Sequence, residues 1–338
     1  DRRALTAAFQ YLVMGTIGAT FILIGIGLMY MMTGTLNMAD LAQRLPAVTD
    51  TRTIRVAFAF VTVGVSIKLA LFPLHIWLPN AYSYAPSVVS AFLAATATKV
   101  GIYVLLRLFF TVFGIEFSFD AMHVGEIIAW LAIAAVLTGS LVAIFQDNLK
   151  RMFAYSSVAQ IGYIVLGIAL ATGAGVSAGI VYLFNHALIK GALFMALGGI
   201  MLRLGSVRLS DLHGLLQQMP WTVAAIIAGG LSLIGVPLTA GFISKWYLVV
   251  AVLEAGYWPL AFMVLASSLL TVIYVWRIVE ATCFHSPGDE RPGLREAPLS
   301  MLLPTWLLIA LNLYIGVDAT LLTGLADDAA AMLSGKAP

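Results

Sequence analysis

Three lysines lie deep inside apolar stretches of this sequence, where a charge is costly. Lys68 stands 13 residues after Arg55 and 11 before Pro79, and Lys99 and Lys245 are comparably far from polar segments. A cation at the centre of a membrane helix costs about 2.5 to 3.5 kcal/mol, so three that faced lipid would cost on the order of 8 to 10 kcal/mol. We therefore expect these side chains to face a protein interior or water, where they can load and release protons.

Two other roles are open to a lysine in such a place. It can extend along the lipid face to the headgroups, although its stem reaches about 6 Å while the interface lies roughly 15 Å away. It can also form a static ion pair that locks two helices together. Three lysines on separate apolar segments favour an ion pathway over either role.

A histidine and a fourth lysine share one helical face. His186 and Lys190 are four residues apart, which makes them neighbours on a helix surface. Two cations there would repel, so the spacing favours a neutral His186 or a proton shared between the two sites. Taken alone, His186 is equally compatible with a structural histidine, but the buried lysines favour a proton relay.

Two prolines interrupt apolar segments close to these lysines. Pro73 follows Lys68 by five residues, and Pro237 precedes Lys245 by eight. A proline inside a helix frees a backbone carbonyl, which a membrane tolerates only where protein or a water cavity meets it. Prolines are common in membrane helices, yet the pairing of each with a lysine predicts two broken helices at the midplane of an ion transporter.

The elements that position these residues are membrane helices. Of the 338 residues, 61% are hydrophobic and 10% are charged, against about 25% charged in soluble domains. Apolar windows long enough to cross a bilayer predict an all-α polytopic membrane protein of about nine helices in a single membrane domain, 1–338. The predicted helices are 5–32, 54–78, 84–112, 123–145, 152–172, 175–203, 220–252, 257–284 and 299–323.

The distribution of positive charge predicts the orientation. With the start inside, eight basic residues fall on the cytoplasmic side and four on the other, which favours a cytoplasmic Asp1 and a C-terminus outside. The turn from Gln146 to Arg151, including Lys150, is expected to be cytoplasmic. The inner set is Arg2, Arg3, Lys150, Arg151, Arg203, Arg208, Arg291 and Arg295, and the outer set is Arg44, Arg52, Arg55 and Lys336.

Several chemistries find no support in the sequence. One cysteine, Cys283, allows no internal disulfide, CxxC pair or thiolate-held cluster, and no GxGxxG motif follows a strand. We expect no metal, cofactor or catalytic centre in this chain, so any redox activity would belong to partners. A net charge of +2 does not indicate a nucleic-acid partner. A transporter of organic solutes is a further alternative, but few polar residues surround the lysines.

Four motifs in order resemble the antiporter-like membrane subunits shared by Mrp-type monovalent cation/proton antiporters and NADH:quinone oxidoreductase, or complex I. They are KLALFPLHIWLPNA at 68–81 with Lys99 beyond it, DNLKR at 147–151 with Tyr155-Ser156-Ser157, NHALIKG at 185–191, and GVP at 235–237 with Lys245 beyond it. Asn80 and Tyr82-Ser83-Tyr84 are most similar to the D-type member of the Mrp antiporters.

The resemblance implies a fourteen-span subunit with two inverted repeats, of which this chain is a fragment. Residues 1–112 would end the first repeat, 123–284 would form the second, and 299–323 the final helix. The missing N-terminal helices would carry the carboxylate partner of Lys68. By the same resemblance Lys68 is a switching lysine, Lys99 a central connector and Lys245 the terminal lysine, while His186 and His75 link the axis.

The implied function is proton translocation through this Lys/His axis, as a component similar to the D-type member of a Na⁺ or K⁺/proton antiporter. The alternative is a proton-pumping subunit of an NADH:quinone oxidoreductase or a related hydrogenase complex. Either implies other hydrophobic subunits as partners, a lipid bilayer around the chain, and the bacterial inner membrane as its location.

Overall fold

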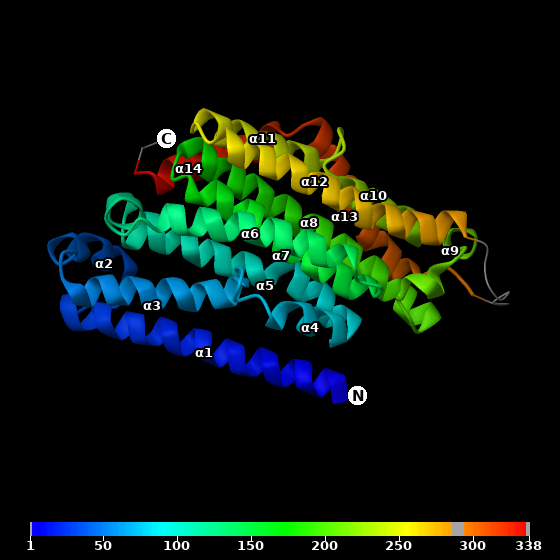
Figure 1. Ribbon diagram of the computed structural model, residues 1–338, viewed down its shortest axis with the longest axis horizontal. Helices are drawn as coiled ribbons and strands as arrows, with labels where there is room; N and C mark the ends of the chain where they lie inside the picture. Colours follow the sequence, from blue (N-terminus) through cyan, green and yellow to red (C-terminus); the bar gives the residue numbers. More distant parts are fainter. Residues whose placement is uncertain (1, 286–293, 336–338) are drawn as a thin grey trace.

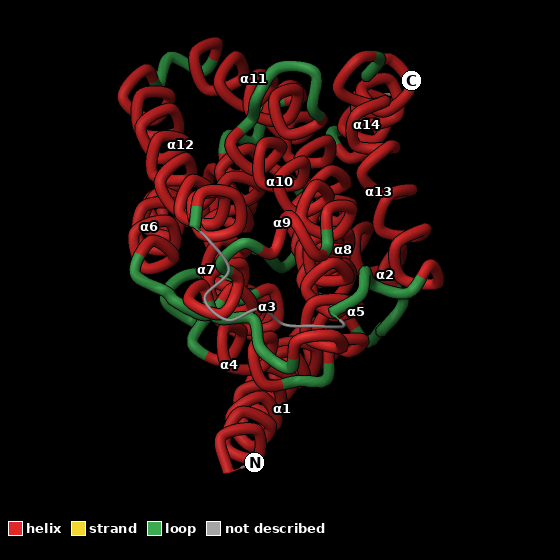
Figure 2. The backbone as a smooth tube through the Cα atoms, turned by 90° about the vertical axis from the view of Figure 1, so that its right-hand side faces the viewer, coloured by secondary structure: helices red, strands yellow, loops and turns green. Residues whose placement is uncertain are grey.

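The computed structural model describes residues 2–285 and 294–335, and there the chain forms helices and their connections, with no strand longer than a single bridge (Figures 1 and 2). The long helices are α1 (Arg2–Thr33), α3 (Arg52–Leu69), α5 (Ser87–Leu106), α6 (Val124–Ile144), α7 (Leu149–Ala169), α8 (Gly173–Leu204), α10 (Pro220–Ile234), α11 (Ala240–Glu254), α12 (Trp258–Val279) and α13 (Leu299–Val317). The shorter ones are α2 (Met38–Arg44), α4 (Trp77–Tyr84), α9 (Leu215–Gln218) and α14 (Thr320–Leu333).

Seven helices of the described chain are long and apolar enough to cross a membrane. They correspond to seven of the nine predicted spans, and the other two, 54–78 and 220–252, are interrupted helices. The predicted all-α, multi-span class with two broken helices is therefore confirmed. Some boundaries were wrong: α5 begins at Ser87 because Pro86 precedes it, and α13 ends at Val317 rather than at 323.

The connection between α13 and α14 has a local cause. The carboxylate of Asp318 accepts hydrogen bonds from the backbone N–H and the hydroxyl of Thr320, at 3.0 and 2.6 Å. These bonds satisfy donors at the start of α14 and hold the pKa of Asp318 below its usual value. A new helix thus begins where the sequence predicted that the last span continues.

The first broken helix stops one residue after Lys68, at Leu69. Ala70 takes a left-handed conformation, with φ of 61°, and closes α3. A turn containing the cis Phe72–Pro73 bond follows, and α4 then begins at Trp77. The indole N–H of Trp77 donates to the carbonyl of Ile67 at 2.9 Å, so the end of α3 is tied to α4 across the break.

The second broken helix separates α10 from α11. Gly235, at φ of 89°, ends α10, and Leu238, at φ of 69°, redirects the chain after Pro237. The hydroxyl of Thr239 accepts from the N–H of Phe242 and starts α11. Both prolines therefore lie in real breaks, as the sequence predicted.

The bundle has a centre and an edge. In its most apolar stretch α7 is 94% buried, whereas α1 is 17% buried. Figure 2 looks along the helices and shows α1 at one edge of the bundle, far from α11 and α12. Glycine allows α1 to pack closely on α3, because a Cβ at Gly64 would lie 2.7 Å from the carbonyl oxygen of Gly18.

The two ends of the bundle carry the charges that the sequence assigned to opposite sides (Figure 1). Arg2, Arg3 and Arg151 line one pocket at the end where α1 begins and α7 begins, while Arg55 and Asp50 line another where α3 begins. The described chain starts and finishes at opposite ends, as an odd number of crossings requires. Asp1, Arg291 and Lys336 lie outside the described residues.

Candidate proton-conducting axis

Lys245 sits at the second helix break and is nearly buried. Its Nζ donates to the carbonyls of Leu233 and Ile234 at 3.0 and 2.8 Å, and to the hydroxyl of Ser268 at 2.9 Å. The two carbonyls belong to the last turn of α10, which has no further helix to bond it. The break thus supplies acceptors for an ammonium group that has left the bulk water.

Lys190 is completely buried between α8 and α7. Its Nζ donates to the carbonyl of Phe153 at 2.8 Å and to the hydroxyl of Ser156 at 2.9 Å. Ser156 also accepts from the hydroxyl of Tyr274 on α12, at 3.0 Å. One serine therefore joins the lysine on α8 to two other helices.

His186 lies one turn from Lys190 and is buried, with 1% of its surface exposed. Neither of its ring nitrogens has a hydrogen-bond partner in the described protein, and it lies close enough to Lys99 and Lys190 to feel both charges. Buried polar atoms normally bind protein or ordered water. The structural-histidine alternative needs satisfied nitrogens, so the geometry favours a histidine that exchanges protons.

Lys99 completes this cluster from α5. It is 7% exposed, and its Nζ donates to the carbonyl of Ala94 on the same helix. Three of the predicted residues, Lys99, His186 and Lys190, are therefore brought together between α5 and α8.

A polar contact links this cluster with Lys245. The side-chain amide of Asn185, next to His186, donates to the carbonyl of Ala240 at 2.9 Å and to the hydroxyl of Ser244 at 2.5 Å. Ser244 is the immediate neighbour of Lys245. The hydrogen bond therefore joins α8 to α11 at the residues that flank the two predicted relay groups.

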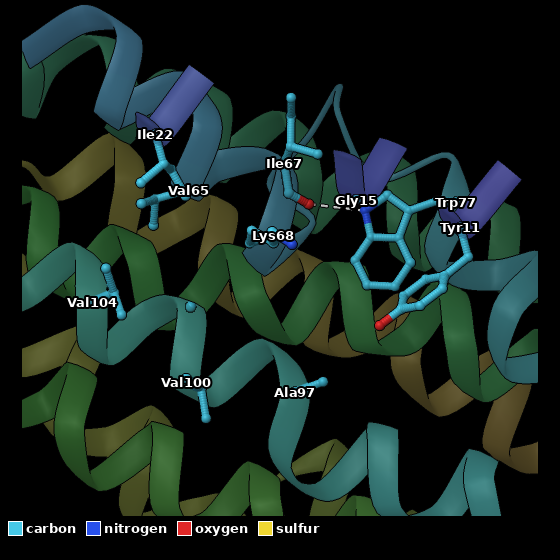
Figure 3. A pocket seen from close by; sticks show the side chains of 11 residues that line it. Tyr11, Gly15, Ile22, Val65, Ile67, Lys68, Trp77, Ala97, Val100 and Val104 are labelled. Atoms are coloured by element: carbon cyan, nitrogen blue, oxygen red, sulfur yellow. Dashed lines mark hydrogen bonds between the residues drawn. The ribbon is translucent and has the colours of Figure 1, made fainter. Parts of the chain in front are cut away.

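Lys68 differs from the other lysines because its side chain is exposed. It lines a pocket of about 220 Å³ between α1, α3, α4 and α5, together with Tyr11, Gly15 and Trp77 (Figure 3). A Cβ at Gly15 would lie 4.0 Å from its Nζ, so the ammonium group approaches α1 where that helix is narrow. The prediction of an interior Lys68 is therefore wrong for the chain as described.

His75 lies in the turn between α3 and α4. Its ring stacks on Phe72 at 5.3 Å and approaches Tyr155 of α7 edge-on at 6.5 Å. Its Nδ1 is buried and has no hydrogen-bond partner in the described protein. His75 thus contacts the central helix α7 but belongs to a different part of the bundle from Lys245.

Neither alternative for the lysines fits the three buried ones. Lys99, Lys190 and Lys245 are at most 7% exposed, so they do not extend along a lipid face. None of them forms an ion pair within residues 2–285 and 294–335, where ion pairs join Arg44 to Asp40 and Arg277 to Asp147. The buried lysines are held by neutral oxygen atoms instead.

Sequence reasoning missed several polar partners. Ser156, Asn185 and Ser244 contact the relay residues, and Ser268 and Tyr163 surround Lys245, whose Nζ lies 5.3 Å from the Tyr163 ring. Ser156 and Asn185 stand inside the four motifs, which was the available signal. Ser268 carries no such signal, because a serine in an apolar helix does not reveal which helix it faces.

These features define a class: a multi-span helical membrane protein with two broken helices and a buried row of basic side chains. The family model described as "NADH:quinone oxidoreductase/Mrp antiporter, TM" matches residues 1–271, and the chain belongs to that family. The resemblance seen in the four motifs is therefore confirmed.

Known relatives include members of both branches. NADH-quinone oxidoreductase subunit N of Desulforudis audaxviator is 44% identical over 321 residues, which are 91% of this chain and 63% of that relative. The D-type member of the Na(+)/H(+) antiporter of Bacillus subtilis is 30% identical over 330 residues, 97% of this chain and 66% of the relative. A chain of the Mrp complex from Dietzia sp. superposes with a TM-score of 0.89 at 29% identity, covering 98% of this chain and 68% of that one. This chain spans less than two thirds of the length of the first relative.

Proposed function

We propose that this chain translocates protons across a membrane through Lys99, His186, Lys190 and Lys245. The observation that carries the proposal is a set of buried amines held by neutral oxygens, beside a buried histidine whose two nitrogens have no partner in the described protein. Amines in such surroundings change their affinity for protons when a nearby charge moves. A proton arriving at one site thus favours release from the next.

Bound water molecules would complete the path. Thr98, Gln160, Asn185 and His186 each present a buried polar atom that has no partner in the described protein. Such atoms are the sites at which ordered water binds in proteins. Water at these four positions would connect Lys99 and Lys190 to the contact between Asn185 and Ser244, and from there to Lys245.

Lys68 would act as the switch of this path, through a partner outside the described chain. Its exposed ammonium lines an otherwise apolar pocket, and the part of the chain that is described offers it no carboxylate. A carboxylate placed in the pocket by the rest of the full-length protein would pair with Lys68. Opening that pair would leave a positive charge that repels a proton on the neighbouring lysines.

The central test is Lys245→Ala in the full-length protein within its native complex. We expect the variant to assemble normally and to lose proton translocation by at least about tenfold, because the relay loses its terminal amine. Proton uptake into vesicles, followed with a pH-sensitive dye and normalised to the amount of assembled complex, measures this. Trp246→Phe, on the exposed face of the same helix, is the control. Wild-type transport by Lys245→Ala would overturn the proposal.

Two assemblies are compatible with this function. We propose a Na⁺ or K⁺/proton antiporter with other hydrophobic subunits, because the residues at 80–84 resemble the D-type antiporter member and the Mrp complex from Dietzia sp. shares the fold. The second candidate is a redox-driven pump, favoured by the 44% identity to NADH-quinone oxidoreductase subunit N. Mild extraction of the native complex decides between them. Bound flavin or iron–sulfur absorbance with NADH-driven quinone reduction would identify the pump, and their absence the antiporter.

The same proposal assigns the parts of the chain and their orientation. Residues 1–112 would end the first inverted repeat, 123–284 would form the second and 299–323 the final helix. The end that carries Lys150, Arg203 and Arg208 would face the cytoplasm of a bacterial cell, because positive loops stay inside.

A further inference from the structure

The first turn of α7 holds a buried lysine that the path described above does not use. Lys150 belongs to the turn that the sequence assigned to the cytoplasmic surface, yet only 2% of its surface is exposed. Its Nζ makes one hydrogen bond, to the carbonyl of Ala85, at the long distance of 3.3 Å. No carboxylate in residues 2–285 or 294–335 pairs with it.

The backbone around Lys150 is fixed at the end of the bundle. The side chain of Asn148 caps α7 by accepting from the N–H of Arg151 at 3.1 Å. Two backbone bonds join this turn to the segment after α8, from Leu149 to Val207 at 2.9 Å and from Leu209 to Asp147 at 2.8 Å. The lysine is therefore held in place and points between α7 and the α4–α5 connection, where Ala85 lies.

One helical turn further along α7 lie the partners of Lys190. Phe153 and Ser156 are three and six residues after Lys150, and both hold the Nζ of Lys190. Residues three or four apart share a helix face, and three residues rise by about 4.5 Å. Lys150 thus stands between the end of the bundle and the buried cluster, on the helix that already holds that cluster.

A purely structural role does not explain this arrangement well. One long hydrogen bond offsets little of the cost of burying an ammonium group, which is large without a partner charge. An orientation signal needs a charge at the surface, as Arg203 and Arg208 provide on the same end. A lysine that exchanges its proton carries the charge only transiently.

We propose that Lys150 is a proton-relay residue that connects the water at this end of the bundle to Lys190 and His186. The inference rests on the proposed function. Water gives a proton to the neutral Nζ of Lys150, so an O–H bond breaks and an N–H bond forms. The ammonium then passes a proton through bound water to the neutral Nζ of Lys190. Each cycle moves one proton and needs no oxidant or reductant.

Arginine at position 150 gives the sharpest test, in the full-length protein within its native complex. A guanidinium keeps the charge and the hydrogen-bond donors of lysine but does not release its proton. We expect Lys150→Arg and Lys150→Met both to slow dye-reported proton uptake into proteoliposomes by at least about tenfold per assembled complex. Arg203→Gln removes a positive charge from the same end and should keep the wild-type rate.

Two results would overturn this assignment. Wild-type uptake by Lys150→Arg would show that a fixed charge or a capping donor is sufficient, and wild-type uptake by Lys150→Met would show that the side chain is dispensable. Where Lys150→Met fails to assemble, the arginine variant still decides the question. Normal transport by Lys245→Ala would defeat the proposed function itself, whereas loss in Lys245→Ala with full activity in Lys150→Arg would defeat this inference alone.

Discussion

Neutral oxygen atoms hold every buried lysine of the proposed axis, but in different numbers. Lys245 has three acceptors, Lys190 has two and Lys99 has one. A carboxylate partner would stabilise only the charged form, whereas a carbonyl or hydroxyl can accept a hydrogen bond from either form of the amine. These surroundings therefore suit groups that must lose and regain a proton in each cycle.

Ser268 tests this view at a single hydroxyl. Ser268→Ala removes the acceptor on α12 and leaves Lys245 with the two carbonyls of α10. A hydrogen bond to a charged group contributes about 1.5 to 3 kcal/mol, so we expect proton uptake to fall several-fold while assembly is retained. Initial rates of dye quenching in proteoliposomes measure this. Ser210→Ala, exposed in the loop after α8, is the control, and an unchanged rate in Ser268→Ala would argue against a positioning role.

The sequence predicted the basic residues better than their partners. A lysine or histidine in an apolar segment is conspicuous because its cost is large. Ser156, Ser268 and Tyr163 cost little in a membrane helix, and their importance depends on which helix they face. That information is tertiary, so one sequence does not contain it in readable form. The exposure of Lys68 likewise depends on packing against residues that the described chain does not include.

The two broken helices show how elements prepare the site. Each break leaves carbonyls at the end of a half-helix without helical partners. At α3 the indole of Trp77 binds one of them, and at α10 the ammonium of Lys245 binds two. The prolines predicted both breaks, but the residues that bind the freed carbonyls follow from how the chain turns.

Close packing at the second break gives an element-scale prediction. A Cβ at Gly241 would overlap the carbonyl oxygen of Ser232, so Gly241→Ala must push α11 away from α10. We expect a loss of about 1 to 3 kcal/mol in the free energy of unfolding, together with slower proton uptake, because Lys245 moves with α11. Denaturant unfolding in detergent and vesicle uptake measure the two effects. Gly324→Ala, which meets nothing within 4 Å in α14, should change neither.

All nine predicted segments exist, but their ends were less predictable than their number. Hydrophobic length identifies a span because the bilayer fixes it. The end of a helix depends on a few local bonds, such as those around the left-handed Ala70 after α3 or the carboxylate of Asp318 before α14. An alanine in that conformation has no sequence signature, so the predicted helix 54–78 ran through the break.

At the scale of the whole molecule, the two ends differ in charge. Arg2, Arg3, Lys150, Arg203 and Arg208 mark one end, and Arg44, Arg52 and Arg55 mark the other. Lys150 is buried, so the surface excess is smaller than the sequence alone indicated. The direction of the excess is unchanged, and it still favours the Arg208 end inside the cell.

Single cysteines test this orientation, since Cys283 is the chain's one native cysteine. In a Cys283→Ser background of the full-length protein, we expect Arg208→Cys to react with a membrane-impermeant thiol reagent only after cells are permeabilised. Asp50→Cys, exposed at the opposite end, should react in intact cells. The reverse pattern would place the Lys150 end outside. It would turn Lys150 from an entry residue for cytoplasmic protons into one for external protons, because the relay through Lys190 is fixed to that end of the bundle.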